Sequence, residues 1–271
     1  MIGQAQLLLL LDLMRDDMPH FIVLTGPAGS GKRTIAKYIA NEFLHCVYSE
    51  VDTKVDSVRE VIESAYKSAT KVLYCFADAD TMRAEAKNAM LKITEEPPVN
   101  AYFIMTVQDD STLLDTIKSR ASVLTLLPYS ESDLLTYMDY IKYPSNPASR
   151  EMLAKVCQTP GDINLMQTYD EQEFYSYVRL VYDNIAEVEP ANAFKSSAKL
   201  AIKDEQGYDL RLFWQMFQYI ALMDLLSNTP KIQNGSAVLI TQQCLNKLQK
   251  VGVNKQQLYD SWVFDIREAW V

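Results

Sequence analysis

The stretch FIVLTGPAGSGKRT, residues 21–34, restricts the folds open to this chain more than any other segment. Five apolar residues lead directly into a glycine-rich loop, and residues 33–44 continue with apolar side chains at helical spacing. Strand, glycine loop and helix in this order are the context of a phosphate-binding loop, whose backbone N–H groups surround phosphate oxygens at the start of a helix. The stretch therefore predicts an α/β fold.

Further apolar runs alternate with helical patterns as far as residue 127 of 271. Beyond the first pair, strands are expected at 71–77, 101–107 and 122–127, and helices at 55–68, 83–95 and 110–120. Strands that alternate with helices form a mostly parallel sheet that is covered on both faces. Residues 1–127 are therefore predicted to form one α/β domain.

From residue 128 onward the strand patterns end, and apolar residues recur only at helical intervals. Residues 128–170 predict a small helical domain, and residues 171–271 predict a second, all-helical one. The helices of this last domain are expected at 171–187, 191–203, 209–227, 236–249 and 254–270. The helix at 209–227 is rich in aromatic residues and Met, which suits either a core helix or a helix that packs partly on a partner chain.

Charge and cysteine content exclude several classes of protein. The net charge of −9 argues against binding nucleic acid over the whole surface, although a local basic face stays open. The four cysteines are scattered without a C-x-x-C pair, so we expect no zinc, no disulfide framework and a cytoplasmic protein with reduced thiols. The leucine run at 7–11 is far shorter than the roughly 18 apolar residues of a membrane span, so no membrane partner is expected.

The glycine loop has the residues that would bind phosphate but lacks the hydroxyl that would hold a metal. Gly26, Gly29 and Gly31 allow the backbone to approach a phosphate, and Lys32 would reach its oxygens. Arg33 stands where a magnesium-ligating Ser or Thr is expected, and a guanidinium has no lone pair to give.

Thr34 is the nearest hydroxyl, but it comes one residue too late and points about 100° away from position 33 on a helix. We therefore expect ATP or ADP to bind without hydrolysis, and magnesium is a doubtful ligand. The alternative is a glycine turn that binds no nucleotide.

Four stretches in the same order resemble the clamp-loader members of the AAA+ ATPase superfamily. They are IGQ (2–4), MPHFIVLTGPAGSGK (18–32), KNAMLKITEEPP (87–98) and TIKSRA (116–121). The stretch at 87–98 is a more distinctive match to the family than a glycine loop, which many unrelated proteins contain. The resemblance covers about residues 2–170, and it implies an AAA+ P-loop-type parallel sheet domain, a helical lid and a helical carboxy-terminal collar domain.

Alignment with this family suggests that several residues needed for hydrolysis in the chain's own site are missing. Ala77 takes the place of the metal-binding Asp, and Asp78 that of the Glu which orients the attacking water. Asp78 and Asp80 could instead be helix-capping residues. Asn164, in PGDINLM, takes the place of the sensor 2 Arg of the lid, and an amide cannot supply that charge.

The Ser-Arg motif of clamp loaders projects an Arg finger into the ATP site of the adjacent subunit. The resemblance implies this role for Arg120, with Ser119 helping to position it. The alternative for Arg120 is a cation that faces a helix dipole. Sensor 1 would be Thr106 or Gln108, and the sequence does not choose between them.

The pattern of losses is most similar to that of the delta prime subunits of bacterial DNA polymerase III, which do not hydrolyse ATP themselves. The partners that this implies are other AAA+ subunits in a heteropentamer, a sliding clamp, and primer-template DNA, contacted indirectly or through a local basic face. Two alternatives stay open. One is an active clamp-loader ATPase with a variant site; the other is an AAA+-derived interaction module in recombination or transposition.

Overall fold

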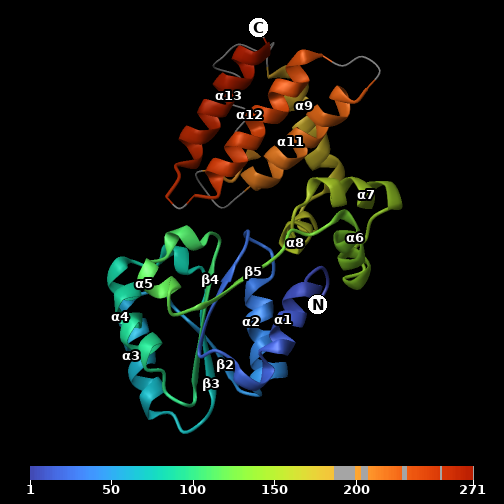
Figure 1. Ribbon diagram of the computed structural model, residues 1–271. Helices are drawn as coiled ribbons and strands as arrows, with labels where there is room; N and C mark the ends of the chain where they lie inside the picture. Colours follow the sequence, from blue (N-terminus) through green and yellow to red (C-terminus); the bar gives the residue numbers. More distant parts are fainter. Residues whose placement is uncertain (186–198, 203–206, 228–230, 251, 271) are drawn as a thin grey trace. The chain divides into compact units, whose positions relative to one another are not determined.

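The computed structural model describes residues 1–185, 199–202, 207–227, 231–250 and 252–270. The chain divides into two units, Met1–Ser130 and Glu131–Val271. The first unit is α/β and the second is helical (Figure 1). The predicted division of the helical part at residue 170 stays a prediction.

A five-stranded, wholly parallel sheet in the order β2-β3-β4-β1-β5 forms the centre of the first unit. Its strands are β1 (Phe21–Thr25), β2 (Val47–Val51), β3 (Val72–Phe76), β4 (Ala101–Val107) and β5 (Ser122–Thr125). The predicted strands are confirmed, but the sequence pattern missed β2. This strand lies at the edge of the sheet, and only Val51 of its five residues is buried, so VYSEV contains no apolar run.

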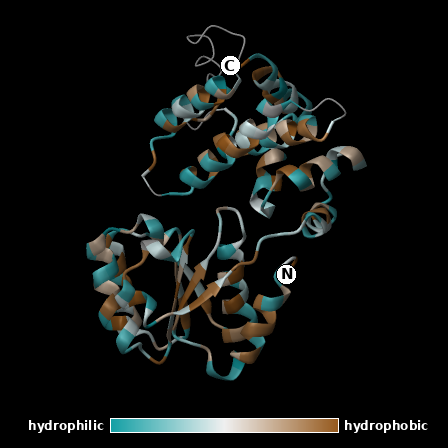
Figure 2. Cartoon of the chain, turned by 45° about the horizontal axis from the view of Figure 1, so that its top comes forward, coloured by the Kyte–Doolittle hydropathy of each residue, from teal (hydrophilic) through white to brown (hydrophobic). Residues whose placement is uncertain are grey.

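Helices cover both faces of this sheet (Figure 1). They are α1 (Ala5–Leu13), α2 (Lys32–Tyr38), α3 (Val55–Lys67), α4 (Ala84–Glu95) and α5 (Asp115–Lys118). Alternate strand residues face opposite layers, because successive side chains of a strand point to opposite sides. Val23, Phe76 and Phe103 pack in the core of α3, α4 and α5, whereas Leu24 and Cys75 pack in the core of α1 and α2. Figure 2 shows the resulting apolar centre of the unit.

Three short turns of 3₁₀-helix, η1 (Arg15–Asp17), η3 (Ala79–Thr81) and η4 (Asp110–Thr112), and a π-helical segment, η2 (Ile39–Leu44), complete the first unit. The continuous helix predicted at 110–120 is wrong. The backbone is extended at Leu113 and Leu114, between η4 and α5. Leu113 is buried in the core, and this packing outweighs the helical preference of the segment.

The second unit consists of helices in its described parts. They are α6 (Glu131–Tyr140), α7 (Pro147–Val156), α8 (Pro160–Met166), α9 (Glu171–Asn184), α11 (Leu210–Leu225), α12 (Ile232–Leu248) and α13 (Lys255–Trp270). Most of the helix predicted at 191–203 lies outside the described residues. Within that range, Leu200 forms an isolated β-bridge with Tyr208 and is not helical.

The aromatic helix α11 lies in the core of the second unit, as one of its two interpretations predicted. Phe213, Trp214 and Phe217 are fully buried, and all three have ring contacts with Trp262 of α13. The Trp262 indole N–H donates to Thr241 of α12, so its polar atom is satisfied inside the core. None of the described helices has the length and apolar content that crossing a membrane requires.

Candidate phosphate loop and arginine finger

The glycine loop connects the end of β1 to the start of α2, as predicted. Gly29 and Gly31 have φ angles of 79° and 90°, which favour glycine, and Gly31 is the N-cap of α2. A side chain at Gly26 would bring a Cβ to 3.1 Å from Leu126 Cβ and 3.2 Å from Ser30 Oγ. The backbone at all three positions therefore depends on the absence of a side chain.

Lys32 is buried against the carbonyl groups of its own loop. Its Nζ donates to the oxygens of Gly26 at 2.6 Å and Pro27 at 2.8 Å. Burial lowers the pKa of the Lys32 ammonium to about 8, against the opposing effect of the Asp78 and Asp80 carboxylates. Lys32 is therefore mostly charged at neutral pH and loses its charge just above it.

Arg33 is held between two carboxylates at the carboxyl ends of β2 and β3. Its guanidinium lies 2.7 Å from Asp78 Oδ2 and 3.4 Å from Glu50 Oε1. Glu50 belongs to the strand that the sequence pattern missed, so this contact could not be foreseen. Thr34, the nearest hydroxyl, is exposed on α2. These residues do not fit a magnesium ion, because the two carboxylates already face a side-chain cation.

Asp78 and Asp80 connect the ends of neighbouring strands, and Asp78 does not cap η3 through its side chain although it stands at the N-cap position. Asp78 has left-handed backbone angles, φ 52° and ψ 47°, and its side chain makes no cap hydrogen bond in η3. Its backbone N–H donates to Thr106 Oγ1 at 3.0 Å, and Asp80 Oδ2 accepts from the backbone N–H of Gln108 at 2.9 Å. Both sensor 1 candidates thus lie beside the acidic strand end, and Thr106 uses its side chain there.

Arg120 comes two residues after the end of α5, and its guanidinium is held by residues of its own unit. One terminal nitrogen donates to the Thr116 carbonyl at 2.7 Å and approaches Ser119 Oγ at 3.4 Å. The other terminal nitrogen forms an ion pair with Glu95, the last residue of α4. Ser119 thus contacts Arg120, and the bond to Thr116 also fits the helix-end alternative. None of these partners belongs to the chain's own glycine loop.

Asn164 and Asp162 lie on α8 in the second unit. Asn164 Oδ1 accepts from the hydroxyl of Tyr137 on α6 at 2.9 Å. Asp162, two residues earlier, is fully buried and caps α8 by accepting from the backbone N–H groups of Gln158 and Thr159. Its other oxygen lies 2.6 Å from Arg211 of α11, in an ion pair that joins the two helices. The sequence pattern gives no sign of this buried pair, because Asp162 and Arg211 lie far apart in the chain.

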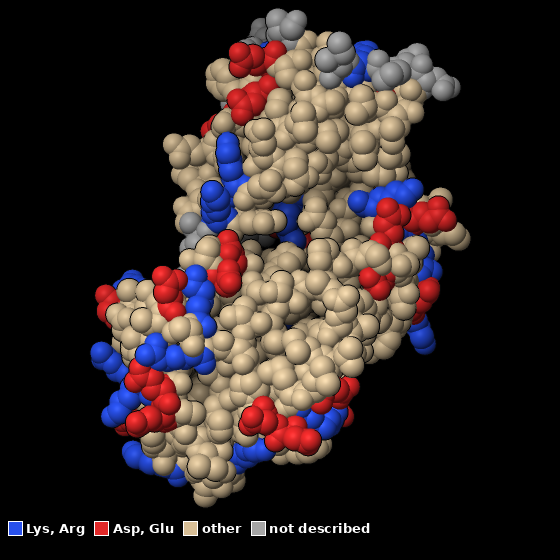
Figure 3. Space-filling view, in the orientation of Figure 1, with Lys and Arg blue, Asp and Glu red and all other residues tan. Residues whose placement is uncertain are grey.

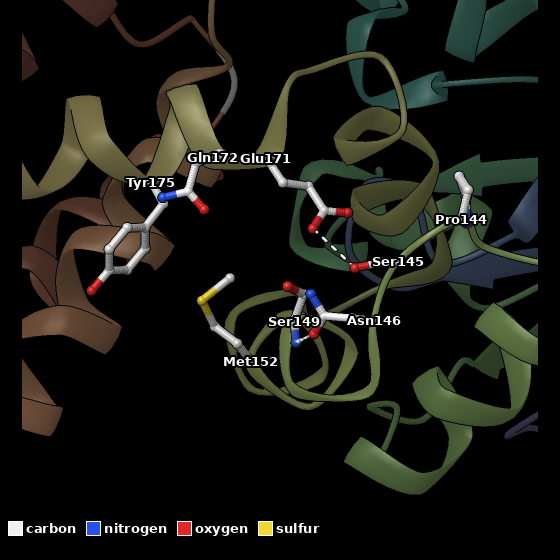
Figure 4. Close-up of a pocket in the computed structure, with 8 residues that line it drawn as sticks. All are labelled: Pro144, Ser145, Asn146, Ser149, Met152, Glu171, Gln172 and Tyr175. Atoms are coloured by element: carbon white, nitrogen blue, oxygen red, sulfur yellow. Dashed lines mark hydrogen bonds between the residues drawn. The ribbon is translucent and has the colours of Figure 1, made fainter.

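A groove of about 440 Å³ in the second unit lies between the turn before α7 and the start of α9 (Figure 4). At one end Ser145 donates to Glu171 at 3.1 Å, and Met152 and Tyr175 lie toward the other. Glu171 is the only charged residue among the described residues that line it. A negative charge without a cation does not suit a phosphate ligand.

The face drawn in Figure 3 and the metal-binding side chains of the described residues give no further site. On the face drawn in Figure 3, basic and acidic side chains of the α/β unit are intermingled, and they form no continuous basic area there. Within the described parts of the chain, no three His, Cys, Asp or Glu residues come together in a way that could hold a metal ion.

The sheet order, the glycine loop after β1 and the acidic end of β3 together define the first unit as an AAA+ unit with a P-loop-type sheet. Solved structures support this fold. A gamma subunit-related protein from Thermotoga maritima superposes with a TM-score of 0.51 at 17% identity, covering 97% of this chain and 99% of that one. The RuvB Holliday junction branch migration motor of Thermotoga maritima superposes with a TM-score of 0.54 at 18% identity, covering 95% of this chain and 87% of that one.

Sequence comparisons show that the unit is similar to subunits of DNA polymerase III and of replication factor C. Residues 45–130 match the family model described as DNA polymerase III, delta subunit. The DNA polymerase III subunit gamma of Buchnera aphidicola (Schizaphis graminum) is 28% identical over 45% of this chain and 42% of its own length. The DNA polymerase III subunit delta' of Escherichia coli is 32% identical over 40% of this chain and 33% of its own length. A replication factor C small subunit of Natronomonas pharaonis is 26% identical over 44% of this chain and 40% of its own length.

These matches confirm the resemblance of the first unit to clamp-loader subunits. The matched part of the chain spans less than half the length of each of these relatives.

Proposed function

We propose that this chain is a delta prime-like clamp-loader subunit that does not hydrolyse ATP and donates Arg120 to the ATP site of a neighbouring subunit. The observation that carries the proposal is the Arg33 guanidinium between Asp78 and Glu50. A cation that belongs to the protein takes the place where hydrolysis would need a metal, because the two carboxylates at the ends of β2 and β3 face it.

The trans role rests on the position of Arg120. Its guanidinium is fixed by Thr116, Ser119 and Glu95, and its partners lie outside the chain's own loop. A fixed guanidinium can stabilise the charge on a transferring phosphoryl group without reorganising during the reaction. The partners in this proposal are related AAA+ subunits in a heteropentamer and a sliding clamp, which the assembly loads onto primer-template DNA during replication.

Copurification with ATPase subunits of the clamp loader from the same source tests the proposal. We expect the tagged chain to form a stable complex with them, and the isolated chain to show no ATP turnover. Turnover that is lost in Lys32→Ala would instead identify an active ATPase with a variant site. Failure to copurify would point to an interaction module outside clamp loading.

The loop itself is proposed to bind ATP or ADP without magnesium. Gly29 and Gly31 hold the loop in a backbone conformation that favours glycine, and the buried hydroxyl of Ser30 has no hydrogen-bond partner among the described atoms. Lys32 supplies a positive charge in the same loop. These residues fit a phosphate group, whereas the surroundings of Arg33 do not fit a metal.

The affinity for ATP in EDTA is expected to fall as the pH rises above about 8, by up to about tenfold per pH unit, because Lys32, whose pKa is about 8, loses its charge. A bound phosphate stabilises the charged ammonium and raises the pKa of Lys32. Binding above this pH therefore takes up a proton and weakens as protons become scarce.

Isothermal titration calorimetry between about pH 7.5 and 9.5 covers the range in which the ammonium titrates. Lys32→Met should bind ATP more weakly and without this pH dependence. A wild-type affinity that stays constant over the range would show that Lys32 does not contact the phosphates.

A further inference from the structure

Two acidic residues stand at the C-terminal end of α4, Glu95 as its last residue and Glu96 as its C-cap, directly before Pro97. A carboxylate at a helix C-terminus is unfavourable, because the helix dipole places partial negative charge there. The ion pair with Arg120 offsets the unfavourable charge of Glu95. No described contact of the Glu96 side chain offsets the charge of Glu96. Glu95 at this position therefore holds the Arg120 guanidinium in place.

The contacts of Arg120 leave one edge of its guanidinium open. A guanidinium has five N–H donors. One terminal nitrogen serves Thr116 and Ser119, and the other gives one N–H to Glu95. The Nε–H has no hydrogen-bond partner among the described residues and lies beside the nitrogen that binds Glu95, so this open edge of the guanidinium still has a donor for a phosphate oxygen. The Arg120 side chain is 32% exposed, so this group is within reach of another chain.

Both ends of this arrangement are anchored in one core. Ile93 of α4 and Ile117 of α5 are fully buried and belong to the same hydrophobic cluster. The backbone segments that carry Glu95 and Arg120 are therefore held against each other by packing. Their ion pair does not have to supply that stability, and an exposed pair contributes little of it.

We propose that Glu95 is the positioning residue of the Arg finger. It fixes the plane of the Arg120 guanidinium so that the open edge faces the phosphates of the neighbouring subunit. This inference rests on the proposed function of Arg120. Its physical basis is that a charge already held in position needs no reorganisation during the reaction, and a small misplacement of a catalytic group lowers the rate strongly.

The test uses the reconstituted complex with its clamp and primed DNA, and it measures the steady-state ATPase. Glu95→Ala is expected to lower kcat about tenfold with little change in KM, because the guanidinium loses its orientation and the neighbouring site still binds ATP. Glu95→Gln should lower kcat less, since its amide oxygen still accepts the hydrogen bond. Glu96→Ala, one residue further on, is the matched control and should behave as wild type.

A double-mutant cycle with Arg120→Ala separates positioning from a structural role. If Glu95 acts only through Arg120, Glu95→Ala should lower kcat no further in the Arg120→Ala background. A wild-type kcat in Glu95→Ala, or a further loss in the double variant, would overturn the inference while leaving the Arg120 assignment intact. A wild-type kcat in Arg120→Ala would contradict the proposed function itself, so the two failures can be distinguished.

Discussion

Replacing Arg120 by alanine is expected to lower the clamp- and DNA-stimulated ATPase of the reconstituted complex at least about tenfold, as for the loss of an Arg finger. The hydrolysing site lies in the neighbouring subunit under this proposal, so the loss should appear in an activity that the isolated chain does not possess. Assembly should survive, because Arg120 is partly exposed and contributes no side chain to the hydrophobic core. Gel filtration of the complex and steady-state ATPase measurements check both expectations.

Lys118→Ala is the matched control for this experiment. Lys118 is the last residue of α5, two residues before Arg120, and its ammonium forms an ion pair with Asp115 at 3.2 Å. Its loss should leave the ATPase close to wild type. Arg120→Lys keeps the charge but loses the planar group with its fixed donors, so an intermediate rate is expected. An unchanged rate in Arg120→Ala would leave only the helix-end role of this cation.

Replacing Arg211 by methionine is expected to lower the free energy of unfolding of the second unit by about 3–5 kcal/mol, as for removing one partner of a buried ion pair. Asp162 is fully buried on α8, and its Oδ1 lies 2.6 Å from the Arg211 guanidinium on α11. Methionine keeps much of the length of the side chain but leaves this carboxylate without a counter-charge. Urea denaturation of the intact chain, followed by the tryptophan fluorescence of its second unit, measures the change.

The pH dependence of this loss identifies its cause. Burial raises the pKa of Asp162, and Arg211 opposes that rise, so the pKa in Arg211→Met should be higher still. The folded variant then takes up a proton more readily than the unfolded chain. Its stability should therefore recover as the pH falls from neutrality, and decline as the pH rises through the folded-state pKa of Asp162.

Arg179→Met is the control for this substitution in the same unit. Arg179 forms ion pairs with Asp183 and Asp224, but its side chain is 36% exposed. Such pairs contribute about 1 kcal/mol or less, so a small effect is expected. A loss in Arg211→Met no larger than that in Arg179→Met would contradict a stabilising role for the buried pair. The double variant Asp162→Asn with Arg211→Met should recover part of the loss, because no buried charge remains.

Much of the α/β unit could be predicted because of where its strands lie. β1, β3 and β4 are flanked by strands and covered on both faces, so each is a continuous apolar run. β2 lies at the edge with one buried residue, and its sequence resembles a loop. Glu50 was missed for the same reason. Likewise, Leu113 packs into the core and interrupts a segment whose local preference is helical.

The amino-acid sequence alone was enough to predict the glycine loop, the alternation of strands and helices around it, and the lack of a magnesium-ligating hydroxyl at position 33, and it left two interpretations of the aromatic helix open. These features depend on neighbours in the chain or on periodic burial, and both can be read locally. Which charges meet is known only from the packing of the folded chain. Arg33 pairs with Asp78 across 45 residues, Arg120 with Glu95 across 25, and buried Asp162 with Arg211. Such pairs depend on how elements that are distant in the chain pack together, and the local sequence does not show that packing.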